Sequence, residues 1–454
     1  MGMLLIKNAT AIVSMDEKST IFSNSDMLIV DGIIKEIGKN LTIDPKNIGR
    51  VIDATGKIIY PGLINTHHHL YQTLTRNIPA VQNMELFPWL RALYQLWKNL
   101  TADMGYWGGI AGMGELVKYG CTTVSDHHYV FPKNQTSIID EEIRAAKDLG
   151  VRIHACRGSM SRGESLGGLP PDMLVQTTEE ILADSERVIQ RYHDKSYGSM
   201  CQIALAPCSP FSVTEDLMIE SAKLARKHGV RLHTHLTETL DEEKYTLETV
   251  GMRPLAYMES LGWTGSDVWF AHGIHFNDEE LDLLKSTQTG VAHCPISNMK
   301  LSSGIARVTE MLEMGIPVGL AVDGSASNDG SNLLAEIRSA YLLQRLRYSK
   351  RTPAGSEFLR LATVGSAKVL GRKDIGSLEI GKMADFFMIE SDCLELSGSL
   401  DDLASIPAVV GYNKPVAMTV VNGKVIFENG ILVGVDEKAA AREVNKIAAA
   451  LHKN

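Results

Sequence analysis

Short apolar runs alternate with amphipathic stretches through the centre of the chain. In each stretch that follows an apolar run, apolar residues recur every three or four positions, which predicts a strand followed by a helix. The predicted strands end near Asn65, Asp126, Arg157, Ala206, His235, His272, His293 and Asp323. Helices are predicted between them over 104–119, 138–149, 178–193, 215–227, 254–261, 278–285, 307–313 and 332–347. Eight strand–helix units favour a closed (β/α)8 barrel, a TIM barrel of the α/β class, over an open sheet.

Both ends of the chain have a different pattern, in which short β-type runs are separated by turn signals. Asp31-Gly32 is a strong hairpin signal, and Asn422-Gly423 and Asn429-Gly430 provide similar turns near the other end. We therefore expect residues 1–60 and 371–454 to form one small composite β-sandwich domain with a C-terminal helix. The barrel would be inserted between them over residues 61–370.

Composition narrows the class of protein. The 454 residues carry a net charge of −9, which disfavours a nucleic-acid partner. No uncharged apolar run is long enough to span a membrane, and the first residues lack the features of a signal peptide. The six cysteines include no Cys-x-x-Cys pair, so neither a zinc ribbon nor a redox motif is indicated. These features together predict a cytoplasmic protein.

Four of the predicted strands end in residue types that bind divalent metals. Two histidine pairs and two single residues have this placement: His67 and His69, His233 and His235, His272, and Asp323. Side chains alternate along a strand, so each pair projects from one face and can bind one ion. One His-x-His pair alone is more often surface or packing chemistry. Four such strand ends predict a metal site in the mouth of the barrel, where TIM-barrel chemistry lies.

Several of these segments resemble motifs of the amidohydrolase superfamily. The similar segments are 61–69, 233–238, 271–273, 323–329 and 375–385. They occur in the family's order and extend over nearly the whole chain. The nearest branch holds aminohydrolases of purines, pterins and s-triazines, which bind one metal. The resemblance thus implies an enzyme that hydrolyses a C–N bond of a cyclic amidine.

The resemblance implies one divalent metal ion per subunit, bound by His67, His69, His235 and Asp323. Three imidazoles and a carboxylate suit zinc, with iron as the alternative. His233 is interpreted as a supporting or packing residue behind the ligands. The variant with two metals requires a lysine at the end of the fourth strand. Residues 206–208 occupy that place without one.

The implied catalytic residues are Glu238, His272 and Asp323. A zinc-bound water has a pKa lowered from about 15.7 towards ~7, which supplies hydroxide at neutral pH. Asp323 would accept the water's proton, and Glu238 would protonate a ring nitrogen. His272 would hydrogen-bond the attacking oxygen before ammonia leaves. The same hydroxide can cleave an amide or displace chloride, so the pocket decides which group leaves.

Five residues are expected to bind the substrate: Gln72, Trp89, Arg157, Cys208 and Asn298. Trp89 either stacks on a flat ring or packs its loop. Arg157 either binds a carbonyl or anionic ring or forms a salt bridge, and Asn298 either reaches the substrate or fixes its loop. The apolar stretch 84–100 either caps the pocket or forms an interface between subunits.

Segments 70–90 and 156–172 are similar to those of 8-oxoguanine deaminases, which implies deamination of 8-oxoguanine to urate and ammonia. Triazine hydrolases share parts of both, so an s-triazine or pterin aminohydrolase or chlorohydrolase is the alternative. Glu238 and Asp323 argue against a non-catalytic binding protein. A nucleic-acid editing deaminase would have another fold and a Cys-rich site. The expected partners are a small aminated heterocycle and further copies of the chain.

Overall fold

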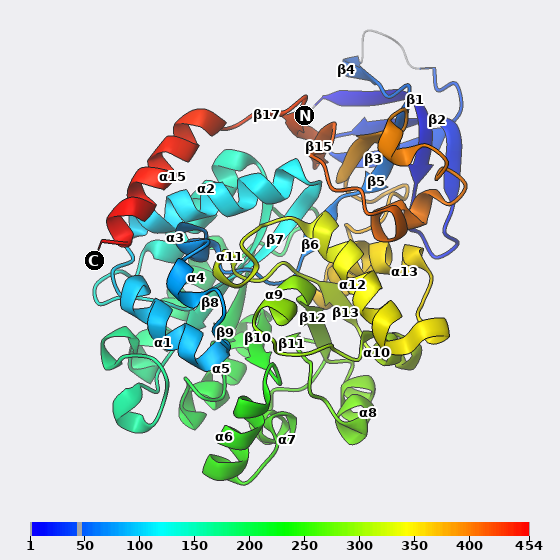
Figure 1. Ribbon diagram of the computed structural model, residues 1–454. Coiled ribbons are helices and arrows are strands. Elements are labelled where there is room, and N and C mark those ends of the chain that lie inside the picture. The colour runs from blue at the N-terminus through cyan, green and yellow to red at the C-terminus, as the bar shows by residue number, and fades with distance from the viewer. Residues whose placement is uncertain (1, 43–47, 454) are drawn as a thin grey trace.

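Eight parallel strands form a barrel at the centre of the molecule (Figure 1). The computed structural model describes residues 2–42 and 48–453. The barrel strands are β6 (Leu63–Asn65), β7 (Cys121–His128), β8 (Arg152–Ser159), β9 (Cys201–Pro207), β10 (Arg231–Leu236), β11 (Val268–His272), β12 (Gly290–His293) and β13 (Val318–Leu320). The backbone N–H of Thr66 donates to the carbonyl of Leu320 at 3.1 Å, which brings the first and last strands together. The predicted parallel barrel is confirmed.

Helices surround the barrel and connect its strands. They are α1 (Leu86–Trp97), α2 (Ala102–Lys118), α3 (Ile138–Leu149), α4 (Thr178–Tyr192), α5 (Glu215–His228), α6 (Leu240–Val250), α7 (Pro254–Ser260), α8 (Asp278–Thr287), α9 (Pro295–Lys300), α10 (Val308–Met314), α11 (Ser325–Asn328), α12 (Leu333–Tyr348), α13 (Gly355–Arg360) and α14 (Ser366–Val369). Helix α4 begins with a capping box formed by Thr177 and Glu180. Gly150 ends α3 with a φ of 74°, a conformation that glycine adopts without strain. None of the helices in the described part of the chain combines the length and hydropathy needed to cross a bilayer.

The two ends of the chain form a second sheet beside the barrel. Its strands are β1 (Met3–Val13), β2 (Ile21–Val30), β3 (Ile33–Gly38), β4 (Ile48–Asp53), β5 (Lys57–Pro61), β14 (Phe386–Glu390), β15 (Met418–Val421), β16 (Lys424–Glu428) and β17 (Ile431–Leu432). Antiparallel pairing of β5 with β14 joins the N-terminal strands to the C-terminal ones. The long strand β1 pairs with β4 along its first half and with β5 along its second half.

The C-terminal helix α15 (Glu437–Leu451) was expected with the composite β domain, but it lies along α2 of the barrel (Figure 1). Its buried residues Ala440, Ile447 and Leu451 form one apolar stripe, which needs a partner surface. The imidazole of His452 also hydrogen-bonds the carbonyl of Leu74 at 2.8 Å. The helix therefore ties the end of the chain to the loop that follows β6.

A buried ion pair between Arg152 and Asp385 connects the barrel to the composite sheet. The two side chains are 0% and 2% exposed. The guanidinium also donates to Thr123 Oγ1 at 3.1 Å and to the carbonyl of Ser199 at 3.0 Å. Asp385 accepts in addition from the backbone N–H of Asn422 at 2.8 Å. Removing either charge would leave the other buried without a counter-charge.

We expect Asp385→Asn to lower the free energy of unfolding by about 3–5 kcal/mol, because Arg152 remains buried and loses its counter-charge. Urea denaturation followed by circular dichroism measures this change. Glu313→Gln is the matched control, since Glu313 pairs with Arg351 at the exposed surface; we expect no measurable change, because exposed ion pairs contribute little to stability. Equal effects of the two substitutions would contradict the role given to the buried pair.

Candidate metal centre

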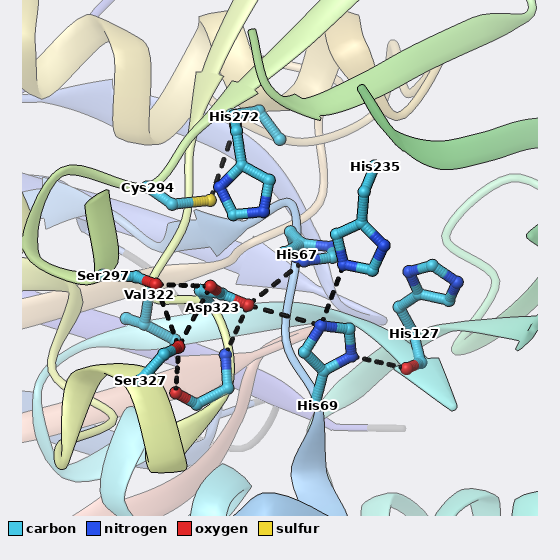
Figure 2. A network of polar contacts seen from close by, with 12 residues as sticks. His67, His69, His127, His235, His272, Cys294, Ser297, Val322, Asp323 and Ser327 are labelled. Atoms are coloured by element: carbon cyan, nitrogen blue, oxygen red, sulfur yellow. Dashed lines mark hydrogen bonds and ion pairs between the residues drawn. The ribbon is translucent and has the colours of Figure 1, made fainter. Parts of the chain in front are cut away.

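The four predicted ligands converge at the mouth of the barrel (Figure 2). His67 and His69 lie just beyond the end of β6, His235 lies in β10, and Asp323 follows β13 by three residues. Asp323 Oδ1 is 3.2 Å from His67 Nε2 and 3.3 Å from His69 Nε2. His69 Nε2 lies 3.1 Å from His235 Nε2. Strands far apart in sequence thus bring four ligand atoms together.

Hydrogen bonds fix which ring nitrogens carry the protons. The Nδ1 of His69 lies 2.7 Å from the carbonyl of His127, and the Nδ1 of His235 lies 2.6 Å from the carbonyl of Cys208. A carbonyl only accepts, so both Nδ1 atoms donate and both Nε2 atoms carry lone pairs. For His67 the acceptor is another histidine, because its Nδ1 is 2.8 Å from His233 Nε2. The Nδ1 of His233 in turn donates to the carbonyl of Trp269 at 2.9 Å.

These residues fit a divalent cation. Lone pairs of His69 and His235 face each other at 3.1 Å with no proton between them, an arrangement that a cation stabilises. Four ligands at about 2.1 Å around a tetrahedral zinc ion are separated by about 3.4 Å, close to the observed distances. Burial lowers the pKa of His67, His69 and His235, so the imidazoles are neutral and able to coordinate.

Asp323 is held as an anion by several donors. Its Oδ2 accepts from the hydroxyls of Ser297 at 2.6 Å and Ser327 at 3.1 Å, and its Oδ1 accepts from the N–H of Gly324 at 2.6 Å. The backbone of Asp323 has a φ of 63°, and that of His272 has a φ of 74°. Both residues are therefore in the left-handed region that side chains disfavour.

Glu238 and His272 form a second pair beside the ligands. His272 Nε2 is 3.3 Å from Glu238 Oε2, and both side chains are buried. Burial raises the pKa of Glu238 to about 7. Burial alone would lower the pKa of His272, but the charges of Glu238 and Asp323 raise it above its usual value. Asn298 Oδ1 accepts a hydrogen bond from His272 Nδ1 at 3.0 Å, which fixes the ring.

A small cavity of about 30 Å³ lies over these groups. Its lining residues are His69, Gln72, Leu86, Trp89, Leu90, Tyr129, Cys208, Phe211, His235, Glu238, His272, Leu301, Asp323 and Ser327. Leu86, Trp89 and Leu90 belong to α1, so this helix covers the cavity. Of the two alternatives for the stretch 84–100, the structure favours the cap.

Of the predicted substrate-binding residues, Gln72, Trp89 and Cys208 line the cavity. The amide oxygen of Gln72 accepts weakly from the N–H of Ala326 at 3.4 Å. Asn298 does not line the cavity, and its side-chain oxygen accepts a hydrogen bond from His272 instead. Their contacts with a substrate stay predictions.

Arg157 is not at the cavity, and its expected contact with the substrate is corrected. Strand alternation gives the reason, because β8 directs Arg157 towards the helices and Cys156 into the barrel. The guanidinium pairs with Asp184 of α4 at 2.8 Å and lies 4.0 Å from the ring centre of Phe131. The salt bridge that was the alternative reading is the one observed.

Two further residues lie near the site. Tyr129 follows β7 and lines the cavity, with its ring centre 5.0 Å from that of His69. His127 of β7 lies among the histidines of the site. Both follow Asp126 at a strand end, which was the available signal. Nothing in the local sequence distinguished His127, which faces the barrel, from His128, which bonds Glu142 at 2.9 Å.

Comparison of the chain with known proteins finds one matching family and several similar proteins. Residues 58–426 match the amidohydrolase family. The chain is 51% identical over 354 residues to 8-oxoguanine deaminase of Pseudomonas aeruginosa, which covers 78% of this chain and 79% of that protein. It is 39% identical over 449 residues to hydroxydechloroatrazine ethylaminohydrolase of Pseudomonas sp. strain ADP, covering 96% and 93%. The crystal structure of atrazine chlorohydrolase from Arthrobacter aurescens TC1 complexed with zinc matches with a TM-score of 0.93 and 34% identity, covering 98% and 100%.

We expect His233→Phe to lower the affinity for a divalent metal by about 10–100-fold, because His67 loses the acceptor that orients its ring. Competition with a chromogenic chelator measures the affinity. His293→Phe is the control, since His293 is a buried barrel histidine whose ring nitrogens have no partner among the described residues. Unchanged affinity in His233→Phe would contradict the supporting role.

Proposed function

Because the chain belongs to the amidohydrolase family, we propose that it removes the amino group of an aminated N-heterocycle by hydrolysis, with 8-oxoguanine as substrate and urate and ammonia as products. Its relatives are deaminases and aminohydrolases, and the chain is accordingly a hydrolase of C–N bonds. The observation that carries the proposal is the buried Glu238 carboxyl beside the imidazole cluster, with a pKa of about 7. Such a group is an acid at neutral pH and can protonate a ring nitrogen.

One divalent metal, zinc in this proposal, would be held by His67, His69, His235 and Asp323. When bound, it supplies a hydroxide nucleophile at neutral pH by lowering the pKa of water. Asp323 is suited to take the proton that water loses, since its carboxylate is ionised and already directed by Ser297 and Ser327. His272, whose orientation Asn298 fixes, would stabilise the developing charge on the attacking oxygen.

The protons balance over three steps. Glu238 gives its proton to the ring nitrogen next to the amino-bearing carbon, and the water oxygen adds to that carbon. Asp323 then transfers the proton it took from water to the amino group, and the C–N bond breaks to release ammonia. The remaining hydroxyl proton returns to Glu238 as the carbonyl forms, so the product keeps the ring N–H and the enzyme regains its starting state.

The choice of 8-oxoguanine is supported by the 51% identity to a deaminase of that name. Gln72 can pair with a ring N–H and C=O, and Trp89 supplies an aromatic face. The similarity to triazine enzymes supports an s-triazine or pterin substrate as the second candidate. Location in the cytoplasm and assembly into a homo-oligomer stay predictions.

We expect zinc-loaded protein to release ammonia from 8-oxoguanine and the Glu238→Gln variant to lose at least about 100-fold in kcat, because the amide cannot donate the proton. A coupled ammonia assay measures both, with guanine, isoxanthopterin and hydroxytriazines in parallel. Chloride release from chlorotriazines is followed separately. Turnover of a triazine or pterin without 8-oxoguanine would replace the proposed substrate, and full activity of Glu238→Gln would remove the assigned acid.

We expect kcat/KM to fall as pH rises above about 7. The general acid must be protonated, and the raised pKa of about 7 leaves most Glu238 protonated at pH 6 but only about one-tenth protonated at pH 8. A pH profile from 6 to 9 at constant metal occupancy measures the decline. A flat profile over this range would contradict the assignment of Glu238 as the acid in the free enzyme.

A further inference from the structure

Glu336 is a buried carboxyl group that has no part in the proposed reaction. It lies in the first turn of α12, and the residue is 0% exposed. Its Oε2 accepts a hydrogen bond from the backbone N–H of Ile296 at 3.1 Å, and its Oε1 accepts one from the side-chain amide of Asn328 at 2.6 Å. Hydrogen bonds from two separate segments therefore meet at one carboxyl group.

The two donors belong to α9 and α11, and each of these helices directs a hydroxyl group to the same oxygen of Asp323 (Figure 2). Ile296 precedes Ser297, whose hydroxyl donates to Asp323 Oδ2 at 2.6 Å. Asn328 follows Ser327, whose hydroxyl donates to the same Oδ2 at 3.1 Å. The two serine oxygens are 2.9 Å apart. The buried carboxyl group of α12 hence contacts the chain neighbours of both hydroxyl donors.

The same two helices reach two other parts of the site. The side-chain oxygen of Asn298 in α9 accepts from the ring of His272. The amide of Asn328 also donates to the carbonyl of Val322 at 2.7 Å, directly before Asp323. Helix α9 has six residues and α11 has four, so neither is stable through its own internal hydrogen bonds. Their positions depend on their neighbours, and α12, with sixteen residues, packs against α9.

We propose that Glu336 is a positioning residue, which holds α9 and α11 in place relative to each other and thereby aligns Asp323 and His272 for the reaction. The inference rests on the proposed function, in which Asp323 moves a proton and His272 stabilises charge on the attacking oxygen. A misplacement of about 1 Å in such groups can cost on the order of 100-fold in rate. Loss of either hydrogen bond to Glu336 is therefore expected to slow the reaction more than it weakens substrate binding.

The test is the Glu336→Gln variant, which keeps the size of the side chain and replaces one oxygen by an NH2 group. That group must face either the N–H of Ile296 or the amide of Asn328, and both are donors. A turned Asn328 amide would place its oxygen against the carbonyl of Val322. We expect kcat to fall at least about tenfold and KM to change less than about twofold, with one metal ion per chain retained.

Asp26→Asn is the matched control. Asp26 is a buried carboxylate of β2 in the composite sheet, and it accepts from the backbone N–H groups of Asn8 and Leu41 at 2.8 and 2.9 Å. We expect Asp26→Asn to lower the free energy of unfolding and to leave kcat unchanged. A structural role alone would give Glu336→Gln the same result, so a kcat within about twofold of that of the unmodified protein overturns the proposal.

Release of cobalt to a chelator tests the same inference without a substrate. Because Ser297 and Ser327 direct Asp323, we expect cobalt to leave Glu336→Gln about tenfold faster than it leaves the unmodified protein or Asp26→Asn. Absence of ammonia release by the unmodified protein from every heterocycle assayed would remove the proposed function. In that case faster cobalt release from Glu336→Gln still supports the positioning role, and an unchanged rate overturns it.

Asn328→Ala replaces Glu336→Gln if the latter fails to fold. This substitution removes the contact with α11 and leaves the contact with Ile296 in place. We expect the same direction of change, a lower kcat at a nearly constant KM, because α11 loses its connection to α12. An unchanged kcat in Asn328→Ala would overturn the proposal.

Discussion

Imidazole lone pairs and one carboxylate oxygen face one another across about 3 Å, an arrangement that a cation would stabilise. The arrangement depends on backbone carbonyls, because those of His127, Cys208 and Trp269 decide which nitrogen of each ring carries a proton. Those carbonyls lie in, or directly after, parallel strands of the barrel, so their positions are properties of the barrel itself. The backbone of the barrel strands therefore both closes the barrel and orients the histidine rings at its mouth.

Alternation along strands made much of the site predictable. The spacing of His233 from His235 within β10 was sufficient to place them on one face, whereas His67 and His69 lie just past β6 and still meet at the site. The strand ends with His272 and Asp323 completed the predicted set. The turn pairs near both termini likewise predicted that the chain ends share one β domain. These signals are local, and they depend only on the two-residue repeat of a strand and on the backbone preferences of Asn and Gly.

The features that local patterns did not reveal depend on contacts between distant segments. Arg157 follows the same alternation, but its direction depends on where β8 begins, and the sequence does not fix that register. The pairing of α15 with α2 joins residues far apart in the chain. Asn298 of α9 was placed near the site, yet its partner His272 comes from strand β11. In each case the neighbour, rather than the residue type, determines the role.

The left-handed backbone at His272 and Asp323 has a consequence for engineering. A side chain in that region costs roughly 1–3 kcal/mol, which the surrounding barrel must offset. Glycine at either position would relieve that cost, yet it would also delete a group on which the proposed chemistry depends. Selection for thermostability alone would thus favour glycine at these two positions. A search for more stable variants therefore has to keep His272 and Asp323 unchanged.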